Sequence, residues 1–339
     1  MTKTEAEIAF KKEVDEVSSK HLKKLQEYML TNYNELSIQF LECFKNYCQK
    51  VVAMQASESD KKGSLGYIHF SLMRTKLIEG AYEFRIDAYD KGWYADKNFC
   101  VGTYGVYQIF RFLEDFSKEL IERRRKYIQK ITVVDVKRYG LEESNKYISV
   151  MTGFIRSVIP QAVKLSDYEA IKRENVFEIA VGEFRDAAEL VYKEDRTEKD
   201  VEKVVRYLNA KQENGYRHEV LDELIFEGVN FKKALWLYFS GKNSRFFNTD
   251  ISESSLMFCK FENGEFNSID FTNSYLVGIN FSGARLRNLN FEGARIMNVS
   301  FENATLEKID FSRAEQLANV NLTNATLIDV LLPDDLEVG

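Results

Sequence analysis

Residues 261–311 read FENGEFNSIDFTNSYLVGINFSGARLRNLNFEGARIMNVSFENATLEKIDF. Every fifth position in this stretch holds phenylalanine, leucine or isoleucine. The pattern extends back to Phe226, because 16 of the 18 fifth positions from 226 to 311 hold one of these residues, and only Trp236 and Gly241 depart. The other 68 positions of that range contain just nine phenylalanine, leucine or isoleucine residues. Neither an α-helix nor a β-strand has a period of five, so the pattern indicates a repeat of another kind.

A second set of positions lies two residues before each fifth position and alternates small with large side chains. Ala284, Leu289, Ala294 and Val299 show the alternation, which makes the true unit a decapeptide. Where this residue is large, a short polar residue such as Asn290 often follows it. Such side chains bond nearby backbone amides, so we expect them at the corners of the repeat.

The segments Ala284-Arg-Leu-Arg-Asn and Ala304-Thr-Leu-Glu-Lys resemble the A(D/N)LXX units of the pentapeptide-repeat family. The resemblance covers only the C-terminal third of the chain. It implies a right-handed quadrilateral β-helix with one pentapeptide per side and the central apolar residue pointing inward. The residues expected in the solenoid core are Phe261, Phe266, Phe271, Leu276, Phe281, Leu286, Phe291, Ile296, Phe301, Leu306 and Phe311.

The sequence therefore predicts an α+β multidomain protein. We expect a mostly α-helical domain over residues 1–220, with a small β-hairpin at 66–90, then the β-helix over 221–333 and an acidic tail over 334–339. After Phe311 the apolar positions shift by one residue, which predicts a single-residue insertion near Glu315-Gln316 that a local bulge would accommodate.

The first 56 residues have the three-and-four spacing of amphipathic helices. Leu36, Phe40, Phe44, Tyr47 and Val51 form one apolar stripe, and long helices commonly bury such stripes against a partner. We therefore predict a homodimer formed through this stripe. The sides of the rod are expected to offer little apolar area, because they carry polar residues such as Asn267, Thr272, Ser282, Arg287 and Glu292. The alternative is that the stripe belongs to the core of its own domain.

A capping box is indicated by the serine and glutamate of the segment Ser166-Asp-Tyr-Glu169. It predicts a helix that runs to Lys193. A further helix is expected after Thr197 and should stop before Asn214-Gly215, a pair suited to a left-handed helix end. The solenoid would begin shortly after this pair.

Charge and cysteine content restrict the environment and the partners. The net charge is −6, and residues 221–339 carry 17 acidic and 10 basic residues, a balance of −7. This acidity argues against nucleic acid as a direct partner and allows a basic protein surface. The four cysteines lack metal-ligand spacing, no signal-peptide core is visible, and no apolar run approaches the length of a membrane span. We expect a cytoplasmic protein without membrane contact.

No constellation of catalytic or ligand-binding residues is recognisable. The three histidines, His21, His69 and His218, are scattered, and no glycine-rich phosphate loop or nucleophile motif is present. We therefore expect no cofactor, no metal site and no enzymatic activity.

Three functions are compatible with these observations. The first is a protein-protein interaction scaffold or adaptor whose partner the sequence does not identify. The second follows from the resemblance, since the quinolone-resistance members of the family imply an acidic β-helix that mimics DNA and binds gyrase, a topoisomerase. The third is an accessory subunit of a modifying enzyme.

Overall fold

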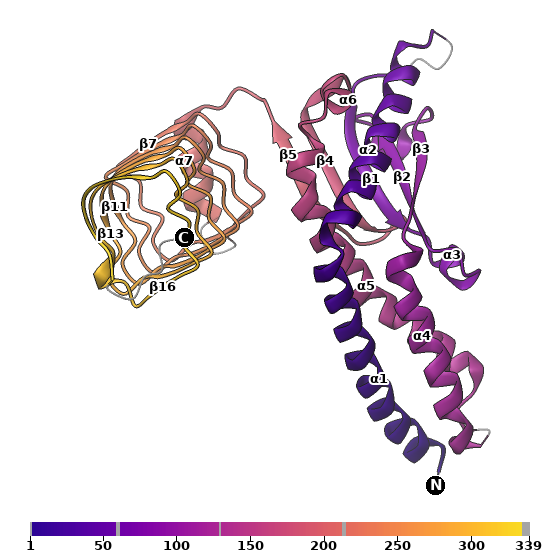
Figure 1. Cartoon of the computed structure of the whole chain (residues 1–339). Coiled ribbons are helices and arrows are strands. Elements are labelled where there is room, and N and C mark those ends of the chain that lie inside the picture. The colour runs from indigo at the N-terminus through magenta and orange to yellow at the C-terminus, as the bar shows by residue number, and fades with distance from the viewer. Residues whose placement is uncertain (1, 59–61, 129, 212–214, 334–339) are drawn as a thin grey trace. The chain divides into compact units, whose positions relative to one another are not determined.

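The computed structural model describes residues 2–58, 62–128, 130–211 and 215–333, and the predicted acidic tail lies outside them. The chain forms two compact units, Met1–Arg196 and Thr197–Gly339. The first combines long helices with a sheet, and the second is a coiled β-solenoid (Figure 1). The boundary lies earlier than residue 220 because helix α7 (Val201–Lys211) belongs to the solenoid unit.

Four long helices form most of the first unit. They are α1 (Lys3–Thr31), α2 (Tyr33–Ala56), α4 (Tyr107–Arg123) and α5 (Val133–Ala162), with a 3-10 turn, η2 (Arg124–Tyr127), after α4. The predicted helical segment up to residue 56 is confirmed, although Asn32 divides it into two helices. Reciprocal side-chain and backbone hydrogen bonds begin α5, where Thr132 and Asp135 form a capping box.

The unit also contains a five-stranded sheet with the strand order β3-β2-β1-β4-β5. The strands are β1 (Leu65–Leu72), β2 (Glu83–Tyr89), β3 (Cys100–Gly105), β4 (Arg173–Glu183) and β5 (Ala188–Asp195). β1 and β2 pair antiparallel, as expected for a hairpin at 66–90, and the short helix α3 (Arg74–Ile78) lies in their connection. A short turn, η1 (Trp93–Ala95), links β2 to β3.

The predicted helix from Ser166 to Lys193 is wrong. Helix α6 spans only Ser166–Glu169, and its side chains make no capping hydrogen bond. The chain then forms β4 and β5, with β4 parallel to β1 and β5 antiparallel to β4. Phe177, Ile179 and Val181 alternate along β4 and are buried, which is the period of a strand and not of a helix.

The predicted dimer stripe lies inside the first unit. Its five residues are at most 4% exposed, and the values run from 0% for Phe44 and Val51 to 4% for Tyr47. The ring of Phe40 lies 5.7 Å from Phe70 on β1 and 6.2 Å from Phe154 on α5. The stripe therefore fills the space between helices and sheet, as in the alternative interpretation, and this surface is not available to a partner subunit.

The second unit is a four-sided solenoid with 20 residues in each turn. One sheet contains β6 (Tyr216–Arg217), β8 (Leu235–Leu237), β10 (Ser255–Met257), β12 (Tyr275–Val277), β14 (Arg295–Met297) and β16 (Gln316–Ala318). The opposite sheet contains β7 (Ile225–Glu227), β9 (Arg245–Phe247), β11 (Glu265–Asp270), β13 (Arg285–Asn290), β15 (Thr305–Asp310) and β17 (Thr326–Leu331). Isolated parallel bridges such as Ser240↔Lys260 and Asp250↔Asp270 mark the other two sides.

The central residue of each pentapeptide lies inside the solenoid. All eleven residues expected in its core are at most 1% exposed. Equivalent phenylalanines stack from turn to turn: Phe281 lies 5.4 Å from Phe261 and 5.5 Å from Phe301, with nearly parallel rings. The period of five in the sequence is thus the period of inward-facing side chains on successive sides.

Trp236 and Gly241, the two departures from the repeat, are accommodated by neighbouring aromatic side chains. Gly241 occupies a central position, and the ring of Phe239, two residues earlier, fills the space that its side chain would take. A Cβ atom at Gly241 would lie 3.1 Å from Phe239 and 3.2 Å from Phe261.

Trp236 is fully buried and packs edge-on against Tyr216, whose hydroxyl donates to the carbonyl of Leu208 on α7. Helix α7 therefore packs against the aromatic first turns of the solenoid.

The predicted insertion near Glu315-Gln316 is present. Strand pairs before it are offset by 20 residues, whereas Arg295 of β14 pairs with Gln316 of β16. The amides of Glu315 and Gln316 both donate to the carbonyl of Ala294, at 2.9 and 3.3 Å. One acceptor thus serves two donors in a bulge that follows the 3-10 turn η4 (Phe311–Arg313).

Candidate protein-interaction face

The outward positions of each pentapeptide decide what the four sides of the solenoid present to solvent. The residue immediately after each central position points outward, and parallel pairing aligns equivalent residues in rows along the rod. On the sheet of β6 to β16 this row is almost entirely apolar. The register pairs Leu237 with Met257, Met257 with Val277, Val277 with Met297 and Met297 with Ala318. All five side chains are partly exposed.

Further apolar side chains widen this row. Leu235 and Tyr275 lie one residue before central positions of the same sheet, and Tyr275 is 37% exposed. Tyr238 and Phe258 lie two residues after central positions, and Phe258 is 48% exposed. We call this surface the apolar face; it consists of Leu235, Leu237, Tyr238, Met257, Phe258, Tyr275, Val277 and Met297.

The aromatic edge of the apolar face has an unfavourable backbone conformation. The position two residues after the central residue has a positive φ in nearly every pentapeptide, and asparagine or glycine occupies it in most of them. Tyr238 and Phe258 have φ values of 55° there. Bulky residues adopt this conformation at a cost, and such strain concentrates at functional sites. Their rings stack at 5.4 Å, and His218 stacks on Tyr238 at 4.9 Å.

The other three sides are mainly polar. Their outward rows include the residues from which we expected polar surfaces: Asn267, Thr272, Ser282, Arg287 and Glu292. The expectation that all sides of the rod offer little apolar area is wrong, because the fourth side is the apolar face. The sequence does contain the pattern of the apolar face, because apolar residues recur every 20 positions at 237, 257, 277 and 297. A comparison of every fifth position does not separate this row from the other three sides.

Short polar residues hold the corners, as the sequence indicated. The side-chain oxygens of Asp270, Asn280, Asn290 and Asp310 each accept the amide proton of the residue two positions later, at 2.9–3.1 Å. Buried Ser274 joins successive turns, because its hydroxyl donates to the carbonyl of Ile251 at 2.8 Å. These bonds satisfy backbone amides and carbonyls, so the corner side chains have a structural role.

Among the described residues, no group of three or more histidine, cysteine or acidic side chains is placed to hold a metal ion. His21 lies 2.9 Å from Glu119. His69 is 3% exposed among aromatic rings, and burial lowers its pKa to about 4. The four cysteines are free, and burial raises the pKa of Cys48 and Cys259 to about 12, which keeps both thiols protonated.

Within the part of the chain that the structure describes, no helix combines the length and the apolar character needed to traverse a bilayer.

Residues 265–303 match the family model described as pentapeptide repeats, with eight copies. No curated protein matches the chain. Among solved structures, a pentapeptide repeat protein from the thylakoid lumen of Arabidopsis thaliana is 25% identical, with a TM-score of 0.24 over 35% of this chain and 72% of that chain.

Two further solved structures are similar. The pentapeptide repeat protein Rfr23 from the cyanobacterium Cyanothece 51142 is 18% identical, with a TM-score of 0.24 over 41% of this chain and 100% of its own. Full-length QnrB1, a plasmid-mediated fluoroquinolone resistance protein, is 18% identical, with a TM-score of 0.19 over 32% of this chain and 70% of its own. All three similarities cover less than half of this chain.

Proposed function

We propose that this chain, whose C-terminal unit is a pentapeptide-repeat solenoid, is a non-catalytic interaction scaffold that binds a protein partner through the apolar face. The observation that carries the proposal is the concentration of partly exposed apolar side chains on one side of an otherwise polar rod. Contiguous exposed apolar surface rimmed by polar residues marks protein interaction sites. A rigid sheet also loses little conformational entropy when it binds.

The chemistry of the apolar face favours a protein partner. Methionine and tyrosine are enriched at the centres of protein interfaces, where charged residues are depleted. Met257 and Met297 flank Val277 in the central row, and Tyr238 and Tyr275 lie to either side. The partner would present a complementary apolar surface. A cytoplasmic location remains part of this proposal.

The DNA-mimicking alternative has less support. A duplex mimic needs a continuous field of negative charge, but several acidic side chains of the solenoid are paired with basic ones. Arg287 pairs with Glu307 at 3.2 Å, Arg313 with Glu292 at 2.6 Å and Arg295 with Glu315 at 2.5 Å. The role of an accessory subunit of an enzyme is a special case of the scaffold and would use the same face.

An affinity-capture experiment with the full chain tests the scaffold. Val277→Asp places a charge at the centre of the apolar face, and we expect it to lower the retention of a specific partner by at least about tenfold, because a buried unpaired charge costs several kcal/mol at an interface. Asn267→Asp is the matched control, since it adds the same charge at the same repeat position on the opposite sheet. Equal retention by both variants and the wild type would contradict the proposal.

The homodimer stays a prediction, and the same variants test it. If sedimentation shows that the wild type and Asn267→Asp are dimers while Val277→Asp is a monomer, the partner is a second copy of this chain. Such a dimer would use the apolar face and not the buried helical stripe. A dimer that all three proteins retain would place the contact elsewhere.

A separate prediction concerns the strained aromatic edge. Phe258→Asn should leave the free energy of unfolding within about 1 kcal/mol of wild type, because relief of the left-handed conformation, about 1–2 kcal/mol, offsets the lost ring stacking, about 0.5–1.5 kcal/mol. Partner retention should fall. Denaturant melts and the capture experiment measure the two effects. A loss of more than about 2 kcal/mol would show that the ring is there for stability.

A further inference from the structure

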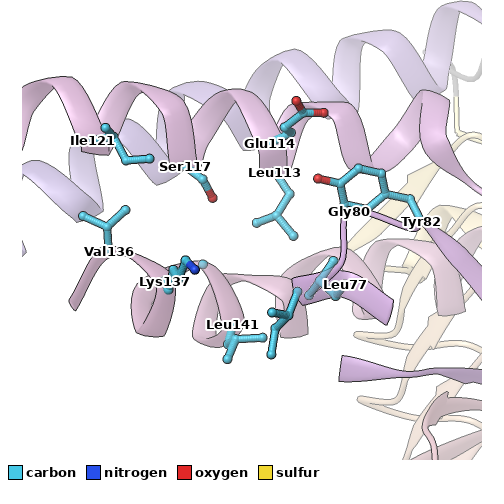
Figure 2. Close-up of a pocket in the computed structure, with 12 residues that line it drawn as sticks. Leu77, Gly80, Tyr82, Leu113, Glu114, Ser117, Ile121, Val136, Lys137 and Leu141 are labelled. Carbon is cyan, nitrogen blue, oxygen red and sulfur yellow. The ribbon is translucent and has the colours of Figure 1, made fainter. Parts of the chain in front are cut away.

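The first unit contains an apolar cavity that the scaffold function does not use. It lies between α4 and α5 near α3, and its volume is about 290 Å³. Figure 2 shows its two long walls, with Leu113, Ser117 and Ile121 from α4 facing Val136, Lys137 and Leu141 from α5. This volume is at the small end of the range for ligand sites, about 300–1,000 Å³, so the cavity suits a small molecule.

Two small residues meet where α4 and α5 come closest, beside the cavity. Gly140 on α5 lies against Ser117 on α4, and a Cβ atom at Gly140 would be 3.2 Å from the hydroxyl oxygen of Ser117. The helices therefore approach closely at this point, while the larger side chains on either side hold them apart. Gly80, with φ of 76°, lets the chain turn at the end nearest to α3. The walls are otherwise aliphatic, which favours an apolar ligand body.

Two charged side chains line the cavity, the carboxylate of Glu114 and the ammonium of Lys137. Glu114 is already neutralised by Lys118, whose ammonium lies 2.6 Å from its carboxylate. Among the described residues, Lys137 forms no ion pair with any carboxylate at this rim. Ser117 and Tyr82 add hydroxyl donors, and in Figure 2 the Ser117 hydroxyl points into the gap between the helices. Burial raises the pKa of Tyr82, so its hydroxyl stays protonated.

We propose that this cavity binds a small monocarboxylate with an unbranched apolar tail. The tail would lie between Leu113, Ile121, Val136 and Leu141, and the carboxylate would reach the ammonium of Lys137 and the hydroxyl of Ser117. The aliphatic walls favour the tail, and the cation without a carboxylate partner favours an acid over an alcohol. A neutral apolar ligand would gain nothing from the charge of Lys137, which is exposed and would stay hydrated.

Calorimetric titration of the full chain with octanoate, hexanoate and octanol tests the proposal. We expect octanoate to bind, hexanoate to bind about tenfold more weakly because it lacks two buried methylenes, and octanol to bind about tenfold more weakly because it lacks the charge. No heat of binding for octanoate at millimolar concentration would overturn the proposal. Equal affinity for octanoate and octanol would overturn the assignment of a carboxylate.

Two variants locate the ligand. Lys137→Gln should weaken octanoate about tenfold and leave octanol unchanged, whereas Lys12→Gln, at an exposed lysine of α1, should change neither. Ser117→Leu fills the space between the helices and should abolish binding of both ligands, with circular dichroism melts confirming that it folds. Octanoate binding that survives Ser117→Leu, or that falls equally in the two lysine variants, would place the ligand elsewhere.

Discussion

Phe281→Ala should lower the free energy of unfolding by about 3–5 kcal/mol. This loss should exceed that of a substitution at any exposed residue in the same turn. The ring of Phe281 is fully buried. It stacks between Phe261 and Phe301 and meets Phe266 edge-on at 5.2 Å. Alanine would leave a cavity that the stacked turns above and below cannot close, because their backbones are fixed by parallel pairing. Urea melts of the full chain, followed by circular dichroism, measure the loss.

Arg287→Ala is the control for this prediction. Arg287 belongs to the next pentapeptide, its side chain is 49% exposed, and it forms only a surface ion pair with Glu307 at 3.2 Å. Such pairs contribute about 0–1 kcal/mol, so the control should melt close to wild type. If Arg287→Ala were instead the more damaging change, the assignment of inward and outward positions would be reversed.

The solenoid could be predicted because each of its rules is local in the sequence. Phe281, Leu286 and Phe291 recur at five because every pentapeptide sends its central residue to the same core. Asn280 and Asn290 precede such residues because each corner needs an acceptor for an amide two positions away. Even the insertion near Glu315 could be located, because one extra residue displaces every later apolar position.

The helices and the hairpin of the first unit could be predicted, but strand β4 resisted prediction because it depends on a distant partner. Residues 173–183 become a strand only because β1, about a hundred residues earlier in the chain, offers an edge for parallel pairing. The capping pattern at Ser166 and Glu169 is local and satisfies the sequence rule for a helix start, but only the four-residue helix α6 forms there. The stripe of α2 has the spacing of a buried face, but spacing alone does not distinguish an intramolecular core from a dimer contact.

The apolar face was missed for a related reason. Its residues are neighbours in space only through the 20-residue period of the turns, so Met257 and Val277 look like isolated apolar residues in the sequence. The cavity of the first unit could not be predicted either, because Ser117 and Gly140 meet only through the crossing of α4 and α5. Local rules therefore specify the rod, and long-range pairing specifies the surfaces on which its function is proposed.

The alternation of small and large residues leads to the second large effect, at Ala294. This residue is fully buried at a corner, in line with Ser274 of the preceding turn and Ala314 of the next. Small side chains recur in this column because the corner brings the backbone close to the core. Ala294→Leu should overpack this column and lower the free energy of unfolding by about 1–3 kcal/mol.

Val299→Ile is the matched change in the column of large residues. Val299 is 1% exposed and lies between Ile279 and Val320. The site should accept one added methylene at a cost of less than about 1.5 kcal/mol. Urea melts of both variants and the wild type compare the two columns directly. Equal losses from the two substitutions would show that the alternation does not record the packing of the corners.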